Sequence, residues 1–86
     1  MAKVANGNGK ASCQDGLVAT GSATVEGAKI GINNDKAVGA VTSSQTSVTC
    51  DGSYVLIKDD VVAGHGDGAH AAPTLKTPGQ SSVTIG

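Results

Sequence analysis

The shortage of large apolar side chains is the feature that most limits how this chain can fold. Its 86 residues include no Phe, no Trp and a single Tyr, while 13 positions are glycine. Val, Ile, Leu and Ala must therefore fill the core, and short chains bury a small share of their surface. Apolar burial and ordering entropy nearly cancel at this size, so small folds usually add a disulfide, a metal ion or a partner subunit. We expect one domain, residues 1–86, that depends on such an addition.

β-Branched residues alternate with small polar residues along much of the chain. The pattern is seen in SATV, VTSSQTSVTC, SYVLI and SSVTI, and disordered segments lack such alternation. Gly or Pro interrupts helical periodicity in nearly every window of about eleven residues. Turn-forming residues separate the apolar stretches at 6–9, 15–16, 33–35, 51–52, 58–60, 66–68 and 78–79. The sequence predicts an all-β fold with strands of about four to eight residues.

A weak internal repeat begins at Gly-Ser corners. GSATVEGAKIGINND starts at Gly21, GSYVLIKDDVVAGHGD starts at Gly52, and a shortened GQSSVTIG starts at Gly79. The first two units share a small residue pair, a β-branched strand, a polar turn, a second apolar strand and a closing aspartate, Asp35 or Asp67. Three strand-turn-strand units favour a stack with near three-fold symmetry.

The charge pattern argues against a nucleic-acid partner. The net charge is −1, arginine is absent and the lysines are scattered singly, whereas nucleic-acid binding normally needs a basic face. The stretch MAKVANGNGK lacks the apolar core of a secretory signal, and no apolar run approaches about 20 residues. We therefore expect synthesis in the cytoplasm without a signal peptide.

Four side chains are good ligands for a borderline-soft metal: Cys13, Cys50, His65 and His70. Two Cys and two His complete a tetrahedral set of the kind found in structural zinc sites. Both histidines lie in VVAGHGDGAH, residues 61–70, where glycine frees the backbone to turn them toward a common point. The sequence predicts one structural metal ion bound by three separate segments, with zinc as the expected ion and iron as the alternative.

Other interpretations of these residues remain open. The two cysteines can form a disulfide or be two unrelated thiols, and the histidines can be exposed loop side chains. A protein made in the cytosol seldom carries a structural disulfide, and a disulfide leaves the paired histidines unexplained.

A catalytic metal site is a further alternative, because Asp67 lies between the two histidines and a metal with an open position activates water. Four soft ligands fill that position, and the chain has few large side chains to line a substrate pocket. We expect no enzymatic activity, and Asp35 and Asp67 are interpreted as turn-closing residues.

The second repeat unit resembles the PAAR-repeat proteins, which are small conical tips on the trimeric β-helical spikes of contractile phage tails and bacterial type VI secretion systems. A repeat in that family has Gly-Ser, a β-branched strand, a turn, Pro-Val/Ala-Ala-Arg and Gly-Asp. Here residues 61–64, VVAG, stand at the name-giving motif, without its proline and arginine. The ending GQSSVTIG is similar to the family's closing strand, and the resemblance covers residues 13–86.

The resemblance implies a small conical, three-fold pseudo-symmetric stack with a metal near its apex. The family's tip metal, commonly zinc, is held by three His and one Cys, where this chain offers two of each. The implied function is a structural membrane-piercing tip, one per spike trimer, that meets the outer membrane of a target cell transiently. Its implied place is a virion baseplate, or outside the cell after contractile secretion. The alternative function is a small β-sandwich that binds carbohydrate or decorates a virion.

Overall fold

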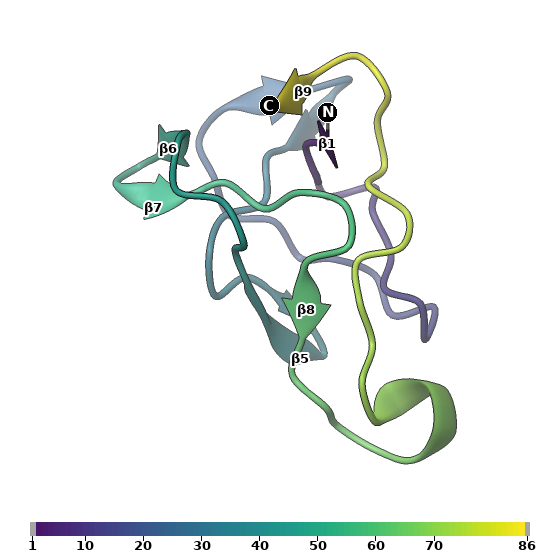
Figure 1. Ribbon diagram of the computed structural model, residues 1–86. Helices are drawn as coiled ribbons and strands as arrows, with labels where there is room; N and C mark the ends of the chain where they lie inside the picture. The colour runs from purple at the N-terminus through teal and green to yellow at the C-terminus, as the bar shows by residue number, and fades with distance from the viewer. Residues whose placement is uncertain (1, 86) are drawn as a thin grey trace.

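Short antiparallel strand pairs make up the fold of residues 2–85, which the computed structural model describes (Figure 1). The elements in chain order are β1 (Ala2–Lys3), β2 (Thr24–Val25), β3 (Ala28–Lys29), β4 (Lys36–Ala37), β5 (Gly39–Thr42), β6 (Thr49–Cys50), β7 (Ser53–Tyr54), β8 (Val61–Val62), the 3₁₀ turn η1 (Gly68–His70) and β9 (Thr84–Ile85). The all-β prediction is confirmed. The predicted strand length is wrong, because the strands described span two residues, or four in β5.

Three chain segments meet in a closed ring of hydrogen bonds. The Ala5 amide donates to the Leu56 carbonyl, Leu56 donates to Gly31, and Gly31 donates back to Ala5, each with an N···O distance of 2.9 Å. Isolated bridges join the same segments at Val4–Ile57, Asn6–Ile30 and Ile32–Val55. Each segment thus pairs with both others in the same way, which is three-fold pseudo-symmetry. Each ring segment pairs with one neighbouring segment at its first residue and with the other neighbour two residues later. Pairing with either neighbour therefore cannot continue into a longer strand, which explains why the strands are short.

A strand pair precedes each ring segment. The pairs β2–β3 and β6–β7 are hairpins with the two-residue turns 26–27 and 51–52, and the backbone φ angles are 49° and 81° in the first and 55° and 81° in the second. Positive φ at both positions is typical of the type I′ turn, whose twist suits a tight hairpin. The third pair, β9–β1, joins the two ends of the described chain. Its register is equivalent, because a threonine at 24, 49 or 84 lies opposite Lys29, Tyr54 or Lys3.

Acidic turn residues link each hairpin to its neighbour. Glu26 accepts hydrogen bonds from the Ser81 amide at 3.0 Å and the Ser82 hydroxyl at 2.6 Å. Asp51 accepts from the Ser22 amide at 2.8 Å and the Ser22 hydroxyl at 2.6 Å. These hydrogen bonds, led by those from the serine hydroxyls, hold the pKa of both carboxyl groups below their usual values.

Buried aspartates close the turns after two of the ring segments and correct the predicted repeat. Asp35 accepts the Ile32 amide at 2.9 Å, and Asp60 accepts the Ile57 amide at 2.8 Å, so these two aspartates are equivalent. The expected partner of Asp35 was Asp67, which instead precedes η1 and makes no side-chain cap hydrogen bond. The predicted register failed because its two Gly-Ser corners differ: Gly21-Ser22 lies before a hairpin, while Gly52-Ser53 lies within one.

Three loops form the end of the molecule opposite the hairpins. They span residues 9–17, 35–41 and 60–75, and each is closed by an equivalent amide-to-carbonyl bond: Leu17 to Gly9, Val41 to Asp35, and Leu75 to Asp60. Figure 1 shows β1, β9, β6 and β7 in the upper part of the view and β5, β8 and the η1 loop in the lower part. We call these the hairpin end and the loop end. The body measures 32 × 22 × 21 Å.

Small hydrophobic clusters lie toward each end among the described residues. The hairpin-end cluster contains Val4, Ile30 and Val55, with the partly buried Val25, Ile32, Cys50 and Ile85 packed against it. The cluster toward the loop end contains Ala5, Ala11, Cys13, Leu17, Ala37, Val41, Leu56, Val62 and Leu75. In residues 2–85, no helix has the length and apolar character needed to cross a bilayer.

Candidate metal centre

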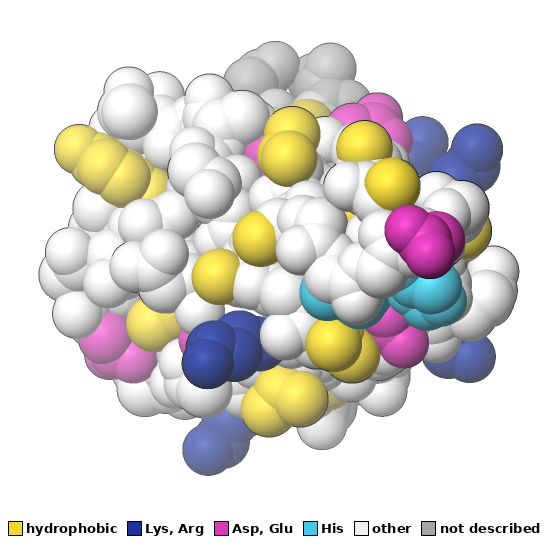
Figure 2. Space-filling view, turned by 90° about the horizontal axis from the view of Figure 1, so that it is seen from below, with side chains coloured by type: hydrophobic (Ala, Val, Ile, Leu, Met, Phe, Trp, Pro, Cys, Tyr) yellow, Lys and Arg dark blue, Asp and Glu magenta, His cyan; other side chains and the backbone are white. Residues whose placement is uncertain are grey.

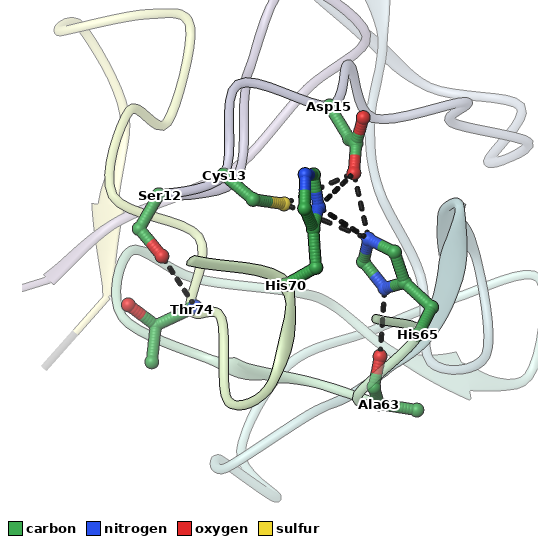
Figure 3. A network of polar contacts seen from close by, with 7 residues as sticks. All are labelled: Ser12, Cys13, Asp15, Ala63, His65, His70 and Thr74. Carbon is green, nitrogen blue, oxygen red and sulfur yellow. Dashed lines mark hydrogen bonds and ion pairs between the residues drawn. The ribbon is translucent and has the colours of Figure 1, made fainter. Parts of the chain in front are cut away.

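Two of the three loops bring four potential ligands together at the loop end (Figure 3). Cys13 and Asp15 come from the 9–17 loop, and His65 and His70 come from the 60–75 loop. Their ligand atoms all lie within 4.8 Å of one another. The cluster could therefore hold one metal ion.

The 9–17 loop directs its two ligands to one side. The Ala11 amide donates to the Asp15 carbonyl and the Gln14 amide donates to the Ala11 carbonyl, both at 2.9 Å. Gln14 adopts φ 71°, which reverses the chain between the two ligands. Cys13 and Asp15 consequently stand on the same side of a tight turn, and the Cys13 Sγ lies 3.0 Å from the Asp15 Oδ2.

The 60–75 loop folds back on itself to bring the two imidazoles together. The His65 amide donates to the His70 carbonyl at 2.9 Å, and the chain between the two histidines reverses through η1. Gly68 opens η1 with φ 62°, a conformation that side chains rarely adopt. Five residues apart in sequence, the His65 Nε2 and the His70 Nδ1 are 3.1 Å apart.

The spacing of the four ligand atoms approaches, without reaching, that of a tetrahedral site. The Asp15 Oδ2 lies 2.7 Å from the His65 Nε2 and 3.3 Å from the His70 Nδ1, and the Cys13 Sγ lies 3.7 Å from the His65 Nε2. Zinc bonds of about 2.0–2.3 Å place tetrahedral ligand atoms about 3.3 Å apart, and about 3.6 Å apart where one is sulfur. The Asp15 Oδ2 lies closer than this to both the His65 Nε2 and the Cys13 Sγ, so the carboxylate would have to move outward to reach that geometry.

His65 is oriented for metal binding by its second ring nitrogen. The His65 Nδ1 lies 3.0 Å from the Ala63 carbonyl oxygen, so it carries the proton and donates it there. The Nε2 points into the cluster, where it donates to the Asp15 Oδ2 at 2.7 Å, and loss of that proton would expose a lone pair to a metal ion. An outer hydrogen bond such as that to Ala63 is the usual means of fixing the tautomer and ring angle of a ligating histidine.

The electrostatics of the cluster favour a cation. Burial, followed by the hydrogen bond to Asp15, raises the pKa of the Cys13 thiol. Hydrogen bonds from Cys13 and His65 lower the pKa of Asp15, and hydrogen bonds to Ala63 and Asp15 raise the pKa of His65. A thiol that resists ionisation beside a carboxylate needs a nearby positive charge to become a thiolate ligand.

The cluster opens to solvent on the side of His70. The Cys13 residue is 8% exposed, and the side chains of His65, Asp15 and His70 are 15%, 24% and 42% exposed. Figure 2, which views the molecule from below, shows the histidines at the surface of this face. A metal ion here would be reached from solvent without opening the core.

The third loop, 35–41, gives room to the site and contributes no ligand to it. A Cβ atom on Gly39 would lie 2.1 Å from the Ala63 carbonyl oxygen and 3.0 Å from the His65 Nδ1. The missing side chain lets the His65 loop pack directly on the Gly39 backbone. Glycine at position 39 therefore allows His65 to take its place in the cluster.

Three of the four expected ligands, Cys13, His65 and His70, converge, but the structure does not bring Cys50 to them. Cys50 belongs to the hairpin-end cluster, at the position equivalent to Val25 and Ile85 in the other strand pairs, and its Sγ lies 4.0 Å from the Ser22 hydroxyl. Both cysteines are free, so the disulfide alternative is wrong.

Asp15 takes the fourth place, whereas the sequence alone predicts only a turn at residues 15–16. The overlooked signal is the Cys-x-Asp spacing, which sets a thiol and a carboxylate on one turn, and zinc accepts carboxylate oxygen as well as sulfur and nitrogen.

The same contacts do not make a nucleophilic triad. Cys13 and Asp15 both approach the Nε2 of His65, whereas a Cys-His-Asp arrangement needs the carboxylate on the nitrogen opposite the nucleophile. The His65 Nδ1 instead donates its proton to the Ala63 carbonyl.

A scan of protein-family models, a search of curated proteins and a search of solved structures each found no match.

Proposed function

We propose that this protein is a structural, metal-stabilised tip that caps a trimeric β-helical membrane-piercing spike of a contractile machine. The observation that carries the proposal is the closed ring of Ala5, Gly31 and Leu56, with three equivalent strand pairs on one side and the metal cluster at the far end. One chain thus has an end with three equivalent strand pairs and an opposite end with a single cluster of potential metal ligands.

The hairpin end supports a partner with true three-fold symmetry. A spike of three identical chains ends in three equal edges, and a monomer matches them only if it repeats one shape three times. The side chains of Val25, Cys50 and Ile85 stand at equivalent, half-buried positions there. The expected stoichiometry is one tip per spike trimer, and no nucleic acid is involved.

The loop end supports the metal part of the proposal. No Phe or Trp is available to pack the loops, and side chains around them, such as Val38 and Val61, are largely exposed. A coordinated ion fixes several loops at once where packing is weakest. One thiolate, two imidazoles and one carboxylate suit zinc, with iron as the alternative. Cys13, Asp15, His65 and His70 would hold it.

The working place of such a tip is a phage baseplate or the outside of a secreting cell. It would meet the outer membrane of a target cell briefly, and it performs no catalysis. The rigid apex has a mechanical task, which is to resist collapse while the spike advances.

Metal content tests the metal part of the proposal, and spike binding tests the partner part. Elemental analysis should find about one equivalent of zinc or iron, lost in His70→Ala and kept in the matched loop variant Asp67→Ala. Less than about half an equivalent, with both thiols reactive in the native protein, would remove the metal part.

For the partner, native mass spectrometry with a trimeric β-helical spike should give a one-to-three complex. Val48→Lys at the hairpin end should weaken this complex and Val38→Lys at the loop end should leave it intact, since both valines are exposed. Glycan binding without any spike complex would instead support the carbohydrate-binding alternative.

A further inference from the structure

The segment 64–72, which includes η1, is attached to the body almost entirely through its two imidazoles. We call it the clasp segment. Among the described residues, its polar contacts outside residues 63–73 are the hydrogen bond of His65 to Asp15, the contact of His65 with the Cys13 sulfur, and the ion pair of His70 with Asp15. Its backbone hydrogen bonds are internal, such as His65 to His70 and Ala71 to Gly68.

Burial gives the clasp segment little further support. No residue from 64 to 72 is buried, and η1 contains no buried side chain. The segment also lies in the longest of the three loops, since 60–75 exceeds both 9–17 and 35–41. Few buried apolar contacts and exposed backbone hydrogen bonds mark a segment that opens at low free-energy cost.

The hydrogen bonds that hold the ring and the strand pairs do not involve the four metal ligands, and Cys13 meets Ala5 and Leu56 only in the apolar cluster toward the loop end. The amides of Ala5, Gly31 and Leu56 are bonded within the ring, and Ala5 and Leu56 are fully buried. The anchors of the 60–75 loop are equally independent, because Leu75 bonds Asp60 and the Val62 amide bonds Pro73. Loss of the ion therefore leaves these elements with their own hydrogen-bond partners.

We propose that the metal centre acts as a clasp: a divalent ion of the zinc class orders residues 64–72 against the 9–17 loop, and the rest of the fold forms without it. The proposal rests on the metal centre proposed above and adds what occupancy of that centre controls. The apex would exist in two states, ordered when loaded and mobile when empty. The hairpin end, which meets the spike, would be the same in both.

Backbone ¹⁵N relaxation of the full chain, stripped with a chelator and then titrated with zinc chloride, tests this. In the stripped protein the order parameters of residues 65–71 should fall below about 0.6, while those of Ala5, Gly31 and Leu56 stay near about 0.85. One equivalent of zinc should return the clasp segment to the rigid range. His70→Ala should keep it mobile at every zinc concentration, and Asp67→Ala should respond like the unchanged protein.

The possible failures are distinct. If zinc binds at one equivalent but residues 65–71 are equally rigid with and without it, the clasp is refuted and the metal centre stands. If zinc binds and chelation also disorders the ring amides, the clasp is again refuted, because the ion then folds the whole chain. If zinc does not bind stoichiometrically, the metal centre itself fails, and the clasp fails with it.

Discussion

Closing the chain into a circle tests the three-fold organisation directly. Val25 and Ala28 are joined by a two-residue Glu-Gly turn, and Cys50 and Ser53 by a two-residue Asp-Gly turn. Ile85 and Ala2 pair in the equivalent register, but they belong to opposite ends of the sequence. A backbone-cyclised variant in which Asp-Gly links Ile85 to Ala2 should complete a third hairpin without strain.

The expected gain comes from the unfolded state. Closure of about 86 residues removes roughly 4.6 kcal/mol of chain entropy from the denatured ensemble at 25 °C, if the native structure accepts the link unchanged. For a domain of this size, each kcal/mol moves the melting temperature by about 4–8 °C, so a rise of about 18 °C or more is the full effect. A strained link would return less.

Urea unfolding of the zinc-loaded circular protein, beside a linear chain of identical composition, measures this gain. A second circle with an eight-residue Gly-Ser link is the matched control, because it closes the chain without a tight turn. The Asp-Gly circle should be at least as stable as the Gly-Ser circle. If it is less stable than the Gly-Ser circle, or no more stable than the linear chain, then Ala2 and Ile85 do not meet as a third hairpin and the symmetry argument is wrong.

Three smaller perturbations address other parts of the structure. Cys50→Val should keep one equivalent of zinc and change the unfolding free energy by less than about 1.5 kcal/mol, whereas Cys13→Val should lose the metal in the same elemental assay. Glu26→Gln should flatten the acid side of the stability profile in urea titrations from about pH 3 to 7. Because folding lowers the pKa of Glu26, its carboxylate stabilises the folded protein fully above pH 4.5, the usual pKa of a glutamate. That stabilisation is lost as the pH falls through the lowered pKa. Gly39→Ala should cost about 1–3 kcal/mol and weaken zinc binding in calorimetry, because its Cβ would lie 2.1 Å from a backbone oxygen, whereas Gly16→Ala meets nothing within 4 Å and should be silent.

The fold class could be predicted from the sequence because its signals are local. Alternation of β-branched and polar residues marks strands, and the turns expected at 33–35, 51–52 and 58–60 occur where dipeptides such as Asn-Asp and Asp-Gly place them. The length of the strands was not predictable from alternation. It follows from the ring, in which each segment changes its pairing partner within three residues. That change of partner depends on residues far apart in the sequence, so no local pattern predicts it.

The wrong ligand, Cys50, has the same origin as the wrong repeat register. SATVEGAKIGINND at 22–35 matches SVTCDGSYVLIKDD at 47–60 with an offset of 25 positions, and this alignment sets Cys50 against Val25. A thiol at a position that otherwise carries an aliphatic side chain behaves as a small apolar residue. The sequence contained this information, but the Gly-Ser pairs gave a different offset and hid it.

Unequal loops explain how one molecule combines a three-fold end with a single candidate metal site. Three equal loops would place three equal ligands around the axis and leave a fourth ligand without a source. Here the 35–41 loop is short, supplies no ligand and packs against the His65 loop through Gly39. The 9–17 and 60–75 loops are longer, and each supplies two ligands. The strand pairs keep the three-fold symmetry that the proposed spike partner would require, and the loops break it to bring four potential ligands together. Shortening the 60–75 loop to the length of 35–41 would therefore remove the metal without disturbing the ring.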